Sequence, residues 1–287
     1  MKSQSVTAPS LTKKRYTFFT DVRRNRFSYL LILPALLYVL VFSYLSYPYM
    51  IIAFKNFNYK LGVFGSEWCG FKNFEFFLKS TNAPTVIRNT LVLNLLFIVT
   101  GTLTSLVLAI LLNELRSRVF VRTAQTMMLF PHYISWVVVS YILLAIFSNK
   151  NGLANQLLNA LGMKSVSWYT KADVWPTILV WMKIWKSAGM NAVIYLAAIT
   201  GIDESIYESA TIDGANRFQR IVSITVPLIM PTVCIMTLLA VGKIMNGDFG
   251  MIYALVGDQG ILYETTDVID TYVYRVLRQT GDPSQSM

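Results

Sequence analysis

The chain has 287 residues, of which 54% are hydrophobic and 14% are charged, and its formal net charge is +10. Its mean hydropathy of +0.49 excludes an ordinary soluble domain and predicts a protein that lies in a bilayer. Much of the positive charge lies in the first 26 residues, where attraction to anionic lipid explains it better than nucleic-acid binding does.

Apolar runs in the sequence predict several membrane-spanning helices. A hydrocarbon core roughly 30 Å thick needs about 20 helical residues, and five runs of suitable length begin at Phe27, Thr90, Thr126, Pro176 and Thr232. Their apolar residues are continuous rather than alternating, which favours helices over barrel strands. The first run is too long for a cleaved signal peptide and predicts a signal anchor.

The basic residues near these runs set the expected orientation. The tail before the first run holds seven Lys and Arg residues and one acidic residue, Asp21. Because basic flanks stay in the cytoplasm, we expect the amino terminus there. Residues 55–89 and 148–175 then face outside, and the link between the fourth and fifth runs faces the cytoplasm.

The cytoplasmic link contains the polar stretch "YESATIDGANRFQRIVSITVPLIMP", residues 207–231. Asp203 or Ser205 can cap a short helix over about 204–212. With Ser205 as the cap, Glu208 stands three residues later and completes a capping box.

A turn and a second helix follow in this stretch. Gly214 supplies the backbone freedom for a sharp turn, and Pro227 and Pro231 are expected to end the second helix before the next span. The acidic first half of the stretch fits either a partner with a basic surface or a solvated linker.

The residues of this stretch closely resemble the EAA loop of membrane subunits in bacterial ABC importers. The matching positions are Tyr207, Glu208, Ser209, Ala210, Asp213, Gly214, Ala215, Ile224 and Pro227. Ser209 replaces the first alanine of the family signature and Val226 stands where leucine is frequent, and both are small or apolar. The resemblance implies that residues 203–227, within a segment of 201–231, couple this chain to a separate ATPase subunit.

The Tyr-Glu-x-Ala-x-x-Asp-Gly-Ala form resembles the carbohydrate-uptake branch of these permeases, the maltose-permease-like group. The stretches "WKSAGMNAVIYLAAI" and "DVIDTYVYR" resemble its members for polysaccharides or complex sugars. The resemblance implies an all-α, polytopic inner-membrane protein with the type I importer (MetI-like) fold. It also implies three partners: an ATPase dimer, a second similar permease subunit and an extracytoplasmic solute-binding protein. ATP and magnesium would bind the ATPase subunits, and this chain would bind no cofactor.

The same resemblance divides the chain into a basic tail (1–26), a first span with its outer loop (27–89) and a permease core (90–287). It further implies a last spanning helix after "DVIDTYVYR", but no apolar run of that length follows. We therefore expect a truncated permease. The alternative is a chain that ends outside with an odd number of spans.

Polar side chains within the predicted spans indicate candidate positions in a substrate path, because such residues are costly in a membrane. They are Asn94, Trp185, Lys186, Asn191, Tyr195, Asn246 and Asp248. Donors, acceptors and aromatic faces of this kind suit a sugar. Lys183 and Lys186 share a helix face, and a path lined by both would favour an acidic saccharide. The structural alternative is that lysines snorkel and amides join helices.

Several motifs that would indicate other chemistry do not occur in the sequence. It contains no Gly-x-x-x-x-Gly-Lys-Ser/Thr loop, no cluster of metal ligands and no hydrolase motif. The sequence therefore predicts a non-catalytic transport subunit without a metal site. Two alternatives stay open: a secondary transporter in which Asp248 relays an ion, and an ABC permease for a solute other than a sugar.

Overall fold

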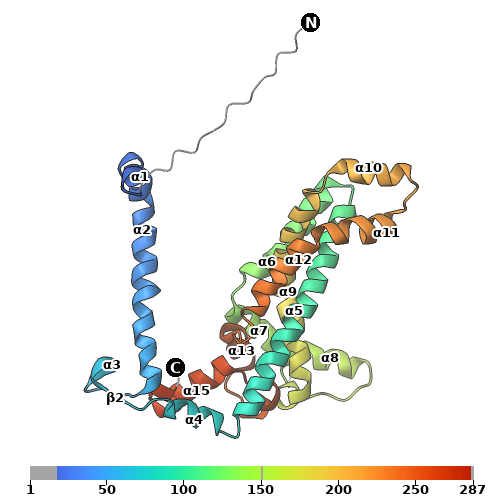
Figure 1. The fold of residues 1–287 in the computed structure, drawn as a ribbon. Coiled ribbons are helices and arrows are strands. Elements are labelled where there is room, and N and C mark those ends of the chain that lie inside the picture. Colours follow the sequence, from blue (N-terminus) through green and yellow to red (C-terminus); the bar gives the residue numbers. More distant parts are fainter. Residues whose placement is uncertain (1–17, 150, 286–287) are drawn as a thin grey trace. The chain divides into compact units, whose positions relative to one another are not determined.

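Helices make up nearly all regular structure in this computed structural model, which describes residues 18–149 and 151–285. Figure 1 shows the elements. They divide into a unit of residues up to 73 and a unit of residues 74–286, and each unit is described by itself. The division lies within the segment 27–89 that the sequence suggested, because residues after 73 pack with the later unit: the Phe77 ring lies 5.3 Å from that of Tyr272.

The first unit is a long apolar helix followed by a small hairpin. Its elements are α1 (Phe18–Arg24), α2 (Arg26–Phe42), the 3₁₀ helix η1 (Tyr44–Phe54), β1 (Lys55–Asn56), α3 (Gly62–Gly65) and β2 (Glu67–Trp68). The strands are antiparallel, with Lys55 opposite Trp68. The Asn73 amide donates to the carbonyls of Ala53 and Lys55, each at 2.9 Å, and thereby closes the base of the hairpin.

The second unit contains the helical bundle. Its elements in chain order are α4 (Lys72–Leu78, which begins at the end of the first unit), α5 (Ala83–Glu114), α6 (Arg118–Tyr133), α7 (Trp136–Phe147), α8 (Leu153–Ala160), η2 (Trp168–Thr170), η3 (Ala172–Val174), α9 (Trp175–Thr200), α10 (Glu204–Ile212), α11 (Arg217–Arg220), the π turn η4 (Ile221–Thr225), α12 (Val226–Val241), α13 (Phe249–Val256), η5 (Gly260–Leu262), α14 (Tyr263–Thr266), α15 (Ile269–Thr280) and η6 (Pro283–Gln285). In Figure 1, α10 and α11 lie at one end of this bundle and α8 and α15 at the other.

The bundle is built on contacts of α5 and α9, with α12 packed against both. One buried cluster lies where these three helices meet and includes Ala109, Ala192 and Ile229. A second cluster, around Trp175 and Leu179, joins α9 to α7 and α13. Small residues on α5 and α9 allow these helices to approach closely, as is common in membrane bundles.

Gly189 allows α6 to lie directly against α9. A Cβ atom at this position would lie 2.0 Å from the Met128 carbonyl oxygen. We expect Gly189→Ala to force the two helices apart and to destabilise the protein by about 2 kcal/mol, as overpacking of a filled interior does. A fall in the thermal unfolding midpoint in detergent would confirm this. Gly101→Ala is the matched control, because no atom lies within 4 Å of the added Cβ there.

Among the described residues, three helical stretches are long and apolar enough to cross a membrane: Arg26–Phe54, Ala83–Glu114 and Arg217–Val241. The pair α6 and α7 makes a fourth span if counted together, with a bend of 95° between them. Helix α9 has 26 residues, a sufficient length, but it is less apolar than these. The third and fifth runs of the sequence are therefore not single straight helices, because the third bends after Tyr133 and the fifth breaks after Val241.

The expectation that Pro227 and Pro231 end a helix is wrong. The apolar helix continues from Arg217 to Val241. Proline removes the i−4 hydrogen bond and crowds the preceding turn, but the wider π turn Ile221–Thr225 comes directly before α12, in which Pro227 lies in the first turn. A π turn accommodates such a mismatch within a continuous helix.

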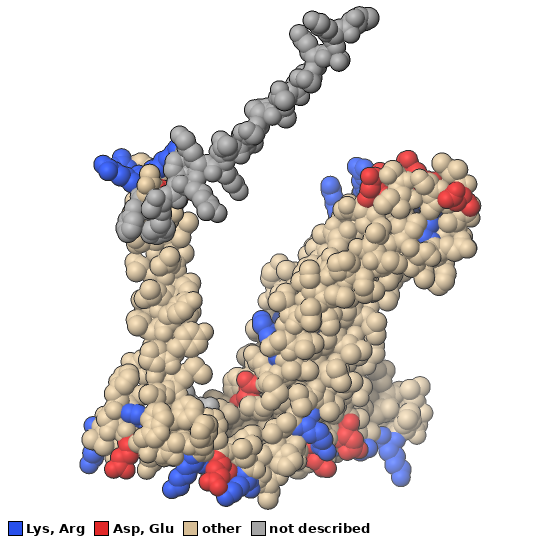
Figure 2. Space-filling view, in the orientation of Figure 1, with Lys and Arg blue, Asp and Glu red and all other residues tan. Residues whose placement is uncertain are grey.

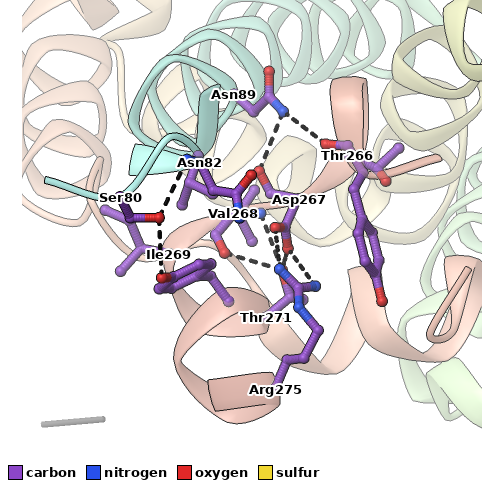
Figure 3. A network of polar contacts seen from close by, with 12 residues as sticks. Ser80, Asn82, Asn89, Thr266, Asp267, Val268, Ile269, Thr271 and Arg275 are labelled. Carbon is purple, nitrogen blue, oxygen red and sulfur yellow. Dashed lines mark hydrogen bonds and ion pairs between the residues drawn. The ribbon is translucent and has the colours of Figure 1, made fainter. Parts of the chain in front are cut away.

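A buried polar network fastens α15 to the start of α5 (Figure 3). The Asn89 amide donates to the carbonyls of Glu264 and Asp267, at 3.0 and 3.2 Å. The Asp267 carboxylate lies 2.5 Å from the Arg275 guanidinium and also accepts from the Thr271 hydroxyl at 2.8 Å. Because each buried charge has a partner, this network holds the segment that follows α13 in one position.

Candidate functional site

The polar stretch forms a helix, an elbow and a second helix at one end of the bundle. Helix α10 spans Glu204–Ile212, as the sequence predicts. Its cap is Asp203, whose carboxylate accepts from the Ser205 N–H at 3.0 Å. That backbone hydrogen bond lowers the pKa of the Asp203 carboxyl. The capping box of Ser205 and Glu208 does not form, because the cap is Asp203, two residues before Ser205.

Gly214 forms the elbow with a backbone φ of 81°. Its N–H donates to the Thr211 carbonyl at 3.1 Å. The next helix starts with a reciprocal capping box, in which Asn216 accepts from the Gln219 N–H at 2.9 Å and Gln219 accepts from the Asn216 N–H at 2.8 Å. The Asn-x-x-Gln spacing was a usable signal for this cap, and sequence reasoning missed it.

Two side-chain contacts tie the two halves of the elbow together. The hydroxyls of Tyr207 and Thr225 lie 2.9 Å apart and join α10 to the π turn. The Arg220 guanidinium donates to the Thr211 hydroxyl at 2.9 Å. Thr225 is buried at 3% exposure, so the Tyr207 contact joins α10 to a packed part of the helix that continues into α12.

The surface of the loop is acidic and partly apolar. Asp203, Glu204, Glu208 and Asp213 are exposed, and among the described residues none of the four forms an ion pair. Figure 2 shows acidic side chains gathered at this end of the bundle. Phe218 is 74% exposed, an unusual position for a large apolar side chain at a polar tip. Unpaired acidic groups beside an exposed ring suit a protein partner.

The nine positions predicted for coupling all lie on this element. Tyr207, Glu208, Ser209 and Ala210 lie on α10; Asp213, Gly214 and Ala215 form the elbow; Ile224 lies in the π turn and Pro227 in the first turn of α12. The fold thus brings together residues that are up to 20 positions apart in the sequence.

A hollow of about 560 Å³ opens in the bundle among α5, α9, α12 and the residues that follow α12. Five of the seven residues predicted for a substrate path line it, namely Asn94, Asn191, Tyr195, Asn246 and Asp248. Lys183 and Lys243 line it as well. Amides, a phenol and charged groups beside apolar wall residues are a combination that suits a polar solute.

The break between α12 and α13, residues 242–248, forms part of the wall of the hollow. The Asn94 amide donates to the carbonyls of Ile244 and Asn246, at 2.9 and 3.0 Å. The Gly247 N–H donates to the Asp270 carboxylate. Irregular backbone at membrane depth is tolerated where protein groups satisfy it and it borders a cavity. Asn94 therefore stabilises the irregular backbone of residues 242–248 and also lines the hollow.

Lys183 and Asp248 form an ion pair across the hollow. The Lys183 Nζ atom lies 2.5 Å from Asp248 Oδ2, and the side chains are 30% and 27% exposed. Asp248 has a φ of 47°, and among the described residues it is the one non-glycine residue with positive φ. Such strain is typical of positions that a functional arrangement holds in place.

Trp185 and Lys186 do not line the hollow, unlike the other predicted positions. The Trp185 side chain is 43% exposed. Lys186 is 9% exposed, and its ammonium group donates to the carbonyls of Pro131 and His132, at 3.2 and 2.8 Å, and to that of Ile134. Lys186 therefore closes the carboxyl end of α6 at the bend, which the sequence analysis did not anticipate.

Comparisons with known proteins agree with this arrangement. Residues 101–278 match the family model of the binding-protein-dependent transport system inner membrane component. The chain is 36% identical to protein LplB of Bacillus subtilis over 93% of this chain and 84% of that protein. It is 32% identical to the polygalacturonan/rhamnogalacturonan transport system permease protein YteP of the same organism, over 100% of this chain and 90% of that protein.

A solved structure is also similar over most of its length. It is that of a bacterial ABC transporter involved in the import of the acidic polysaccharide alginate, with 33% sequence identity and a TM-score of 0.84. The match covers 93% of this chain and 90% of that chain. The likeness therefore extends over most of both chains.

Proposed function

This chain belongs to the family of binding-protein-dependent transport system inner membrane components, and from that premise we propose that it forms the path of a carboxylated saccharide and couples it to a separate ATPase. The family and the sugar transporters similar to this chain show that it is a permease subunit of an ABC importer for sugars or polysaccharides. It is a multi-pass membrane protein of the MetI-like fold and a transport component, not a catalytic subunit.

The hollow supports a saccharide with carboxylate groups. Its lining contains two lysines, Lys183 and Lys243, and one aspartate, Asp248, so positive charge is in excess. Asparagine amides and a tyrosine hydroxyl supply hydrogen bonds for sugar hydroxyls. The alginate transporter is similar to this chain in fold and sequence, and its cargo is an acidic polysaccharide. An acidic oligo- or polysaccharide is therefore the cargo that the site supports best.

The elbow of α10 and α11 supports coupling to an ATPase subunit, and it is the single observation that carries this proposal. The elbow combines exposed acidic groups with a rigid connection, through Tyr207 and Thr225, to the long helix that ends at the hollow. Movement of a partner against α10 would change the position of α12 and with it the access to the hollow. ATP and magnesium would bind the ATPase subunits, with no cofactor on this chain.

The proposal includes the rest of the assembly. A second, similar permease subunit completes the path, and an extracytoplasmic solute-binding protein delivers the saccharide. The amino-terminal tail and the elbow both face the cytoplasm, which agrees with the seven basic residues before the first span.

Glu208→Lys tests the coupling. Glu208 is exposed, so the change leaves the fold intact while it reverses one charge of the partner surface. We expect saccharide-stimulated ATP hydrolysis of the complex to fall at least about tenfold, because like charges at an interface cost several kcal/mol. The measurement is ATPase activity together with co-purification of a tagged chain and its partners.

The matched control is Glu67→Lys, which reverses an exposed glutamate outside the elbow and should leave the ATPase rate unchanged. Equal rates for wild type and Glu208→Lys would contradict coupling through this loop. Recovery of the chain without an ATPase, with uptake that follows an ion gradient, would instead favour a secondary transporter.

A further inference from the structure

We propose that Asp248 holds the position of a substrate carboxylate beside Lys183, and that an acidic sugar residue displaces it from Lys183. The inference rests on the proposed function, because it identifies the residues that select an acidic saccharide. It assigns Lys183 as the carboxylate-binding residue and Asp248 as its exchangeable counter-ion.

The ion pair lies where a solute can reach it. Both residues line the hollow, and about a third of each side chain stays exposed. A uronic acid carries the same carboxylate as aspartate, so it can accept the same charge-assisted hydrogen bond from the Lys183 ammonium. Exchange replaces one carboxylate by another, so the ammonium group keeps a partner throughout and the desolvation penalty of an unpaired charge is avoided.

The backbone of Asp248 is arranged to favour release. Its positive φ of 47° is a conformation that costs free energy in a residue with a side chain. Its second carboxylate contact within α13, with the Met251 N–H, is long at 3.3 Å. Other residues hold the backbone of residues 242–248 in place. The Asn94 amide donates to the Asn246 carbonyl, and the Asp270 carboxylate, which does not line the hollow, accepts from the Gly247 N–H. Displacement from Lys183 therefore allows Asp248 to relax without unfolding the wall.

The positive charge of the hollow favours the binding of a carboxylated sugar over that of a neutral sugar. Lys243 also lines the hollow, and among the described residues it forms no ion pair. An oligosaccharide with several carboxylates can pair with both lysines, whereas Asp248 pairs with Lys183. A neutral sugar cannot separate the ion pair and binds beside it.

The break also lies at the end of the helix that begins at the elbow. The stretch Arg217–Val241 is one continuous apolar helix, and residues 242–248 follow it directly. Movement of Asp248 upon substrate binding would therefore shift α12. The rate of ATP hydrolysis would then depend on the charge of the saccharide.

The test compares two forms of one sugar. The complex, purified with its natural partners and solute-binding protein in lipid nanodiscs, is titrated with trigalacturonate and with its fully methyl-esterified form, and the half-maximal concentration for ATPase stimulation is measured. The two probes share rings and linkages and differ in charge. Because the binding protein is identical in all variants, changes in the acid-to-ester ratio come from the permease.

Lys183→Gln is expected to raise the half-maximal concentration of the acid by at least about tenfold and that of the ester by less than about threefold, as loss of one partner of a charge pair does. Asp248→Asn is expected to lower the acid value by at least about threefold, because no counter-ion has to leave. Lys183→Arg should keep the preference for the acid. The double variant Lys183→Gln with Asp248→Asn should show nearly equal values for both forms.

Lys243→Gln is the matched comparison, since it removes the same charge from the same hollow and leaves the ion pair intact; it should lower the preference for the acid by less than Lys183→Gln does. If it lowers the preference for the acid as much as Lys183→Gln does, overall positive charge sets the selectivity and the exchange is wrong. Equal shifts of acid and ester in Lys183→Gln, or an unchanged acid value in Asp248→Asn, would also overturn it. If neither probe stimulates the wild-type complex, the assignment of an acidic saccharide fails first, and the exchange fails with it.

Discussion

Gly214→Pro is expected to abolish saccharide-stimulated ATP hydrolysis in the assembled importer. The elbow needs a φ of 81° at this residue, whereas the proline ring fixes φ near −65°. The substitution also removes the N–H that donates to the Thr211 carbonyl. A misplaced proline costs about 3 kcal/mol or more, which corresponds to a loss of at least about a hundredfold in the population of the native elbow.

The control for this prediction uses the same position. Gly214→Asn should keep most of the stimulation, because asparagine tolerates the left-handed conformation better than other residues with a side chain, and no atom lies within 4 Å of the added Cβ. Membrane insertion and co-purification with the second permease should be normal in both variants. Wild-type ATPase stimulation in Gly214→Pro would show that the elbow geometry does not transmit the signal.

The elbow was predictable from sequence because its signals are local. Asp203 caps the helix through its own neighbours, and Gly214 stands where the chain must turn. Such features depend on residues within one turn of each other. The continuation of the helix through Pro227 was not predicted, because the sequence analysis did not anticipate the π turn Ile221–Thr225 that precedes the proline.

The two interruptions of the spans were not predictable from apolar composition. Residues 242–248 leave the helix because Asn94 and Asp270, distant in sequence, satisfy the freed backbone groups. The bend after α6 depends in the same way on Lys186. A run of apolar residues predicts a segment long enough to cross the membrane. It does not predict where a side chain from another helix satisfies backbone groups that have lost their helical hydrogen bonds.

Lys183 and Lys186 have different partners, although their spacing places them on the same helix face. Three residues on a helix are about 60° apart around the axis, so both lysines belong to one broad face. Their long side chains nevertheless reach different neighbours: Lys183 reaches Asp248 in the hollow, and Lys186 reaches the carbonyls at the bend. Polarity within a span indicated that both residues have partners, and the partners themselves came from the tertiary fold.

Lys186→Met is expected to lower the stability of the permease by about 1–3 kcal/mol, because a buried acceptor without a donor costs about that much. Methionine keeps an unbranched side chain of similar length but cannot donate to the carbonyls of Pro131, His132 and Ile134. It also loses the contact of the ammonium group with the Trp136 ring, 5.1 Å from its centroid. The measurement is the thermal unfolding midpoint of the purified complex in detergent.

Lys171→Met provides the comparison, since Lys171 is exposed and its loss should leave the midpoint unchanged. Equal midpoints for Lys186→Met and Lys171→Met would mean that the bend between α6 and α7 holds without the ammonium group. A lower midpoint in Lys186→Met, with an unchanged acid-to-ester ratio in the molecules that remain folded, would separate the two lysines by role. Lys186 would then fix the shape of the bundle around the hollow, while Lys183 would act on what enters it.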